Sequence, residues 1–170
     1  LPKNFSAEAF GKDSATLTHD YFPGELNSRW TYEDEQGKEW HSDASAVEVI
    51  HGVHCLKLEN LTAYGLSARW YAEDTIGNLW VLRETFYDGR ENQTPWIFLP
   101  VRPQHGWVID DVGFDGLVSI SAMGVHETLS TGDSHENSIE ISYHSDAVTV
   151  RNYFAPKVGM IRSASLELVK

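Results

Sequence analysis

From residue 21 onward, apolar and polar side chains alternate over short runs, and glycine, proline, asparagine or aspartate separates one run from the next. Successive side chains of a strand point to opposite faces of a sheet, so this alternation predicts strands that bury one face. No long stretch carries apolar residues at the spacing of about 3.6 residues that an amphipathic helix requires. The pattern therefore predicts an all-β chain and argues against an α/β fold.

Two hairpins can be placed from the turn residues between these runs. Tyr32 and Trp40 lie in runs on either side of residues 35–38, which include a glycine. The runs at 66–72 and 79–86 flank a turn that contains Gly-Asn, two residues that tolerate a positive φ. Further strand regions are expected at residues 46–59, 117–122, 125–129, 138–143, 147–154 and 159–169.

Three other segments interrupt the strand pattern. Gly52 falls inside the region 46–59, where a missing side chain suggests a β-bulge or a close approach of another backbone segment. Residues 88–104 contain three prolines, which deny hydrogen bonds to a sheet and indicate a long loop or an edge segment. Residues 1–20 lack alternation and are expected to form an arm or a short helix. We therefore expect one antiparallel meander over residues 21–170, folded as a strongly curved sheet, a barrel or a sandwich.

Length and charge narrow the classes of partner. A chain of 170 residues fits a single domain with a core of its own. Thirteen basic and 25 acidic residues give a formal charge of −12, so the protein is acidic and its field repels phosphate backbones. The apolar runs are far shorter than the ~20 residues of a membrane-spanning helix. We expect neither nucleic acid binding nor a membrane span.

The first residue and the single cysteine bear on the compartment. The chain starts at Leu1 without an initiator Met or a charged-then-apolar leader, as a secreted protein does after its signal peptide is removed. This favours an extracytoplasmic location, either periplasmic or secreted. Cys55 is the only cysteine, so no disulfide forms within the chain. Its neighbours Val53 and Leu56 favour a buried small apolar residue over a nucleophile or metal ligand.

Two segments carry side chains that bind metals in other proteins. His51 and His54 lie three residues apart and would share a face only if the suspected bulge at Gly52 reorients them. The segment 110–116 places three carboxylates among glycines, as a loop around Ca²⁺ would. We expect no cofactor, with scattered histidines and a solvated acidic turn as the simpler interpretation. The alternative is Ca²⁺ or a transition metal held by residues from the set His51, His54, Asp110, Asp111 and Asp115.

The sequence lacks the usual signatures of a catalytic nucleophile or a nucleotide site, including a Gly-x-Ser-x-Gly elbow and a phosphate-binding glycine loop. The abundant aromatic residues instead favour a pocket for a small apolar or carbohydrate ligand. Trp96 and Trp107 are the stronger candidates, because they lie in or beside the proline-rich segment, where core packing explains a large indole least. Trp70 and Trp80 are the other two candidates.

Two segments resemble a known group of proteins. Residues 70–80 fit the pattern Trp-Tyr-Ala-x-Asp-x-x-Gly-Asn-x-Trp, and residues 153–161 contain Tyr-x-Ala-Pro-x-Val-Gly. Both patterns, in this order, resemble a group of uncharacterised secreted bacterial β proteins. The resemblance implies an extracytoplasmic fold, such as the curved half-barrel of lipoprotein carriers, and it implies no catalytic residues. Lys157 stands where that group often has glycine.

Three classes of function follow from these observations. The leading hypothesis is an extracytoplasmic binding module for a small apolar or carbohydrate ligand, with no reaction assigned. The second is a metal-dependent, hydrolase-type enzyme that uses the histidines and aspartates named above. The third is a structural or assembly subunit, a homo-oligomer in which the arm at residues 1–20 pairs with a neighbouring chain.

Overall fold

The computed structural model describes residues 5–62, 65–109, 117–144 and 149–169. The described part is almost entirely β-structure in one antiparallel sheet that does not close, which confirms the predicted fold class. Its elements, in chain order, are a 3-10 turn at Ala7–Ala9 and the strands β1 (Arg29–Glu33), β2 (Glu39–Ile50), β3 (Val53–Thr62), β4 (Gly65–Glu73), β5 (Leu79–Thr85), β6 (Glu91–Asn92), β7 (Trp96–Leu99), β8 (Val108–Ile109), β9 (Leu117–Thr128), β10 (Ser134–His144), β11 (Thr149–Ala155), β12 (Gly159–Ser163) and β13 (Leu166–Leu168).

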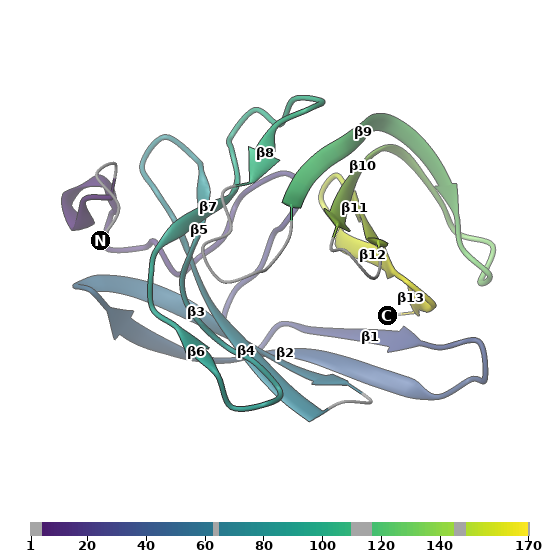
Figure 1. Ribbon diagram of the computed structural model, residues 1–170, viewed down its shortest axis with the longest axis horizontal. Helices are drawn as coiled ribbons and strands as arrows, with labels where there is room; N and C mark the ends of the chain where they lie inside the picture. Colours follow the sequence, from purple (N-terminus) through teal and green to yellow (C-terminus); the bar gives the residue numbers. More distant parts are fainter. Residues whose placement is uncertain (1–4, 63–64, 110–116, 145–148, 170) are drawn as a thin grey trace.

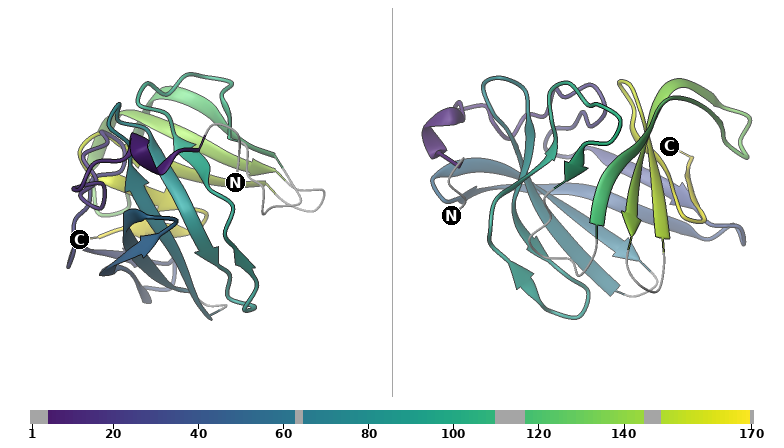
Figure 2. Two further views of the ribbon diagram at one scale, coloured as in Figure 1. Left: turned by 90° about the vertical axis from the view of Figure 1, so that its left-hand side faces the viewer. Right: turned by 45° about the horizontal axis from the view of Figure 1, so that its top comes forward.

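The chain enters the sheet at its middle. The strand order is β6-β5-β4-β3-β2-β1-β13-β12-β11-β10-β9-β8, and β7 pairs with β5 beside this path. Strands β1 to β6 therefore form one half and β8 to β13 the other, and β1 pairs with β13 where the halves meet. Figure 1 shows the two halves curving toward each other, and the tilted view in Figure 2 shows that they enclose a common interior.

One loop design recurs at four hairpins of the described chain. Each loop has five residues. The N–H of the first residue donates to the carbonyl of the fifth at 2.9–3.0 Å, and the N–H of the fourth residue donates to the carbonyl of the first at 2.9–3.0 Å. The fourth residue is always a glycine with a positive φ, between 77° and 93°. This matches a type I turn followed by a glycine bulge, a common hairpin connection. The four loops are Asp34–Lys38, Asp74–Asn78, Phe86–Arg90 and Leu129–Asp133.

The expected bulge at Gly52 is wrong. Residues 46–59 belong to two strands, β2 and β3, joined by the two-residue turn His51-Gly52. Both residues have a positive φ, 50° for His51 and 83° for Gly52, as a type I′ hairpin requires. The dipeptide His-Gly is not among the Asn-Gly, Asp-Gly and Gly-Gly pairs that usually mark such a turn, which is why the sequence did not signal one there. Likewise, the separate strands expected at 117–122 and 125–129 are one strand, β9.

Most large apolar side chains pack inside the curve. Strands of both halves contribute to this inner core, because their inward-facing residues alternate with residues on the outer face. Fully buried members from the two halves are Leu56, Leu79, Val81, Phe98, Val118, Ile120, Ile139 and Ile141.

The N-terminal segment covers the outer face of one half. A second apolar cluster on β3, β4 and β5 includes Cys55, Trp70 and Trp80. Phe5 and Phe10, on either side of the 3-10 turn, each place their ring 5.9 Å from the Trp80 ring in an edge-on arrangement. The predicted arm or short helix is therefore a covering segment in this chain. Helical structure among the described residues is limited to this turn, so none of it has the length of a membrane span.

The following residues close one end of the curve. Leu17 and Gly24 form an isolated β-bridge, which turns the chain back on itself. Between them, the Phe22 ring lies 4.8 Å from the Tyr71 ring on β4. His19 is buried with both ring nitrogens bonded: Nδ1 accepts from the Tyr21 N–H, so Nε2 donates to the Pro100 carbonyl at 3.0 Å. This segment is thus fixed to the sheet at several points.

In two of the four glycine loops, the first residue is an aspartate whose carboxylate accepts a hydrogen bond from a tryptophan. The Asp34 carboxylate accepts two backbone N–H groups of its loop and the Trp40 Nε1–H at 3.2 Å. The Asp74 carboxylate accepts two backbone N–H groups, the Asn78 amide and the Trp80 Nε1–H at 2.9 Å. Asp74 is also the more buried of the two aspartates.

We expect Asp74→Ala to lower the free energy of unfolding by about 3 kcal/mol and Asp34→Ala by about 1 kcal/mol. The difference arises because Asp74 accepts four hydrogen bonds and its bond from the Trp80 Nε1–H is buried, whereas Asp34 accepts three and its bond from the Trp40 Nε1–H is only partly buried. Urea unfolding followed by circular dichroism measures both values, and equal losses would contradict this account of the two loops.

Candidate ligand-binding cavity

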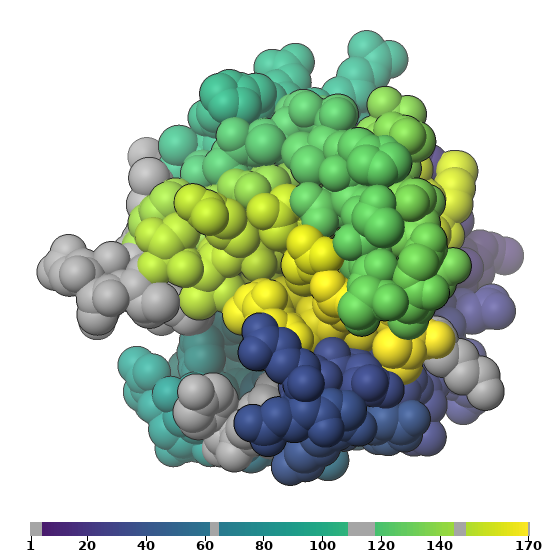
Figure 3. Space-filling view, turned by 90° about the vertical axis from the view of Figure 1, so that its right-hand side faces the viewer, coloured from purple at the N-terminus to yellow at the C-terminus, as the bar shows by residue number. Residues whose placement is uncertain are grey.

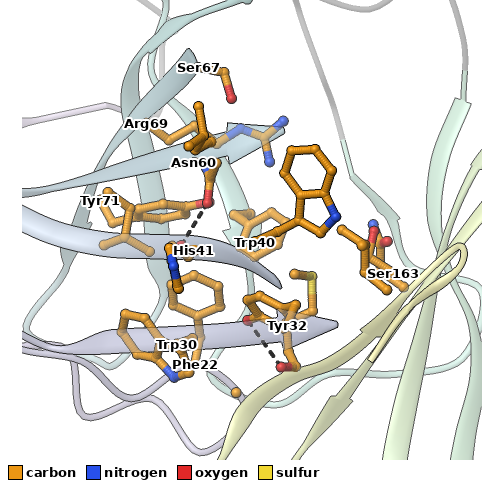
Figure 4. A pocket seen from close by; sticks show the side chains of 18 of the residues that line it. Phe22, Trp30, Tyr32, Trp40, His41, Asn60, Ser67, Arg69, Tyr71 and Ser163 are labelled. Atoms are coloured by element: carbon orange, nitrogen blue, oxygen red, sulfur yellow. Dashed lines mark hydrogen bonds between the residues drawn. The ribbon is translucent and has the colours of Figure 1, made fainter. Parts of the chain in front are cut away.

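A cavity of about 330 Å³ lies inside the curve of the sheet. It extends from Phe22 and Pro23, on the segment that closes one end, to the ends of β3, β4 and β5 around Leu61, Ser67 and Thr85. Both halves of the sheet line it, as the close-up in Figure 4 shows. Further lining residues from the second half are Tyr143, Asn152, Phe154, Met160, Ser163 and Leu166.

One wall of the cavity is aromatic. Trp30 and Tyr32 alternate along β1, and Trp40 lies opposite Tyr32 on β2. Their rings gather around the same space as Phe22 in Figure 4. The polar atoms of two of these side chains are bonded within the protein: the Tyr32 hydroxyl donates to the Met160 carbonyl at 3.2 Å, and the Trp40 Nε1–H donates to an aspartate. The ring faces are thereby held in place as apolar surface.

The neighbouring wall is polar. Asn60 on β3 lies opposite Ser67 on β4, and Arg69 on β4 lies opposite Glu84 on β5. The Nε–H of Arg69 donates to Oε1 of Glu84, and the two side chains are 22% and 3% exposed. Burial opposes the charge on Arg69, but attraction to Tyr71 and Glu84 outweighs it and raises the pKa of the guanidinium. The cavity wall therefore contains a charged pair with no net charge.

A bulge in β5 brings Glu84 into this wall. Trp70 pairs with Arg83, but the next residue, Tyr71, pairs with Val81, so Leu82 is an extra residue in β5. Without it, residues 81, 83 and 85 would face inward, because side chains alternate along a strand. With it, Arg83 lies over the outer face of Trp70, 4.5 Å from the ring centre, and Glu84 faces Arg69 inside.

Two buried oxygen atoms of the cavity lining have no hydrogen-bond partner in the structure. They are Oε2 of Glu84 and Oδ1 of Asn152, which come from opposite halves of the sheet. An unpaired buried polar group costs roughly 1–3 kcal/mol, and native proteins contain few of them. By contrast, Ser42 Oγ donates to Asn60 Oδ1 at 2.6 Å, so this neighbouring pair is satisfied. Three further unpaired buried atoms of the described chain, Asn92 Nδ2, Trp96 Nε1 and Arg162 Nε, belong to residues that do not line the cavity, so the two lining atoms without a partner are both acceptors.

The four tryptophans predicted to bind ligand lie elsewhere. Trp70 and Trp80 are buried in the outer cluster, where their Nε1–H groups donate to Glu48 and Asp74. Trp96 is buried in the inner core, 5.8 Å from the Phe98 ring, and Trp107 is 40% exposed before β8. None of the four is among the residues that line the cavity.

The sequence-based prediction favours tryptophans in or beside a loop, whereas the aromatic wall of the cavity lies on strands β1 and β2. The spacing of Trp30 and Tyr32, two residues apart on one strand, was the available signal, since it places both rings on one face.

The predicted metal ligands do not gather in the described chain. His51 lies at the β2–β3 turn, where its Nε2 is 2.9 Å from the Gln93 carbonyl, and His54 is exposed on β3. Within residues 5–62, 65–109, 117–144 and 149–169, no three His, Cys, Asp or Glu side chains are grouped as a metal site. The other predicted ligands, Asp110, Asp111 and Asp115, lie outside the described residues.

No protein-family model matches this chain, no curated protein is similar to it, and no solved structure matches its fold. The resemblance of residues 70–80 and 153–161 to secreted bacterial β proteins stays an expectation from sequence.

Cys55 is fully buried, and its burial raises the pKa of the thiol to about 12. We expect no measurable reaction of the folded protein with Ellman's reagent at pH 8, because only about one thiol in 10⁴ would be ionised. The same protein unfolded in urea provides the control and should react completely. Labelling of the folded protein at the rate of the unfolded protein would contradict the predicted burial.

Removal of one partner from the buried Arg69–Glu84 pair leaves an uncompensated charge in the cavity wall. We expect Arg69→Met to lower the free energy of unfolding by about 3–5 kcal/mol. The double variant Arg69→Met/Glu84→Leu should regain most of this loss, because both charges are then gone. Urea unfolding of the two variants tests this, and a double variant no more stable than Arg69→Met would contradict the coupling of the pair.

Proposed function

We propose that this protein binds a small organic ligand with a large apolar surface inside its curved sheet. The supporting observation is the cavity: at about 330 Å³ it falls within the range of small-molecule sites, and residues from both halves of the sheet line it. A packed interior contains few voids larger than a water molecule, so a space of this size in the core calls for an explanation. A resident ligand is the explanation we propose.

The composition of the lining indicates an amphipathic ligand. The rings of Trp30, Tyr32 and Trp40 offer flat apolar surface, which suits an aromatic or alicyclic body or the apolar face of a sugar. Asn60, Ser67 and Arg69 on the adjoining wall offer polar atoms that would orient one end of that body. This agrees with the expectation of a small apolar or carbohydrate ligand, although different aromatic residues would contact it.

The other two hypotheses receive no support from a specific observation. The described histidines and carboxylates form no metal group, as reported above. The N-terminal segment makes its contacts within its own chain, including backbone hydrogen bonds from Glu73 and Thr75 to the carbonyls of Ser14 and Ala9. This arrangement gives no reason to propose strand exchange with a second chain. The extracytoplasmic location stays a prediction from the sequence.

A matched pair of variants on β4 tests the binding function. Ser67 lines the cavity, whereas its neighbour Leu66 is exposed at 54% and is not part of the lining. The reporter is N-phenyl-1-naphthylamine, an uncharged dye that fluoresces in apolar sites. We expect saturable binding of one dye per chain, weakened at least about tenfold by Ser67→Phe, because a phenyl ring there fills part of the cavity.

Leu66→Phe should leave the dye affinity unchanged, because it adds the same ring on the outer face. Equal effects of the two substitutions would place the dye outside the cavity. Absence of saturable dye binding to the unmodified protein would overturn the proposed function.

A further inference from the structure

The charge of Arg69 is already compensated inside the cavity. A lone buried arginine in an apolar pocket would favour a ligand carboxylate or phosphate, because a buried charge needs a partner. Here Glu84 fills that role from the adjacent strand, and it is the more buried partner. Arg69 therefore does not require an anion from the ligand.

The unmet requirement in this lining is for hydrogen-bond donors. Oε2 of Glu84 is a carboxylate oxygen, so it can only accept, and it is unpaired. Its side chain faces inward, because Glu84 lies directly opposite Arg69 beyond the bulge in β5. Oδ1 of Asn152 is the second unpaired acceptor of the lining. Asn152 lies two residues before Phe154, a member of the inner core, so its side chain also faces inward.

From these observations we infer that the ligand carries an uncharged or cationic head group that donates hydrogen bonds, a hydroxyl or a protonated amine, attached to an apolar body. This inference rests on the proposed function and names the chemical class of its ligand. The head group would donate to Glu84 on the polar wall or to Asn152 on β11 of the other half, with the body against Trp30, Tyr32 and Trp40.

Two effects separate this class from fatty acids and other carboxylates. A carboxylate has no proton to donate, so it leaves both acceptors unpaired and adds a negative charge beside Glu84. A site built around buried polar groups rejects an analogue that lacks the matching donor far more strongly than it rejects a change in apolar size. The formal charge of −12 on the whole chain acts in the same direction, since it disfavours approach of an anion.

Three probes that share a naphthyl body test the head group. They are 2-(1-naphthyl)ethanol, 2-(1-naphthyl)ethylamine and the carboxylate anion of 1-naphthaleneacetic acid. Isothermal titration calorimetry at pH 7 gives each affinity, and N-phenyl-1-naphthylamine serves as the reporter for the cavity itself. We expect the alcohol and the amine to bind at least about tenfold more tightly than the carboxylate, the least that one charge-assisted hydrogen bond supplies.

The outcomes separate the two proposals. If the reporter binds and the three probes show no preference, whether they bind equally or not at all, the head-group inference fails and the proposed function stands. Tighter binding of the carboxylate would likewise overturn the head-group inference and leave the proposed function standing. If neither the reporter nor any probe binds, the proposed function fails as well.

Two variants test which residues cause the preference for the alcohol and the amine over the carboxylate. Glu84→Gln leaves the charge of Arg69 without a partner, so the carboxylate should gain at least about tenfold in affinity while the amine loses affinity. Because this variant breaks a buried ion pair, Asn152→Leu provides a second test in a protein that keeps the pair. It removes one acceptor, so affinity for the alcohol should fall severalfold, with the carboxylate unchanged.

The matched control for Asn152→Leu is Asn92→Leu. Asn92 also has a buried side-chain atom without a partner, its Nδ2, but it lies on β6 and does not line the cavity. Its replacement should leave all three affinities unchanged. Equal effects of the two asparagine variants on the affinity for the alcohol would overturn the assignment of the head group to the neighbourhood of Asn152.

Discussion

The pairing of the first strand with the last is the contact on which the shape of this protein depends. Tyr32 pairs with Leu168 and Glu33 with Glu167, and the Val169 N–H donates to the Thr31 carbonyl at 2.8 Å. Figure 3 shows the first hairpin, in blue, against the yellow C-terminal residues at this junction. These few backbone bonds connect residues at opposite ends of the sequence, so their closure entropy is offset only when both halves pack on the shared inner core. Without this junction, the cavity would lack the lining residues that β10 to β13 contribute.

Within each half, the glycine loops and the bulges determine which side chains reach the interior. A hairpin loop of fixed length fixes the register of its two strands, and the register fixes which residues lie on the same face. The Asp34 and Asp74 loops do this twice with the same arrangement of hydrogen bonds, and each also anchors an indole. The extra residue Leu82 then changes the face of β5 between Val81 and Glu84. The charged pair in the cavity is a consequence of that bulge.

The two faces of β3, β4 and β5 have different roles although both are apolar. The outer face, with Trp70 and Trp80, is covered by the N-terminal segment and stabilises the sheet. The inner face contributes to the cavity, where polar side chains interrupt the core. The motif at residues 70–80 therefore has an architectural role in its tryptophans, whereas its Tyr71 borders the cavity. A sheet with both faces buried leaves ligand contacts to a small number of inward positions.

The sequence by itself determined the all-β class and most strand regions, because alternation and turn residues act over a few neighbours along the chain, but it did not give every strand boundary. It did not reveal the His51-Gly52 turn, since His-Gly is not one of the dipeptides that usually mark a two-residue hairpin turn. Nor did it identify the cavity side chains. Trp30 and Trp70 lie in equally periodic strands, and only the curvature of the sheet and the cover provided by Phe5 and Phe10 decide which ring faces inward. The unpaired oxygens of Glu84 and Asn152 are likewise a property of the tertiary structure, because strands from opposite ends of the chain must meet before a common interior exists.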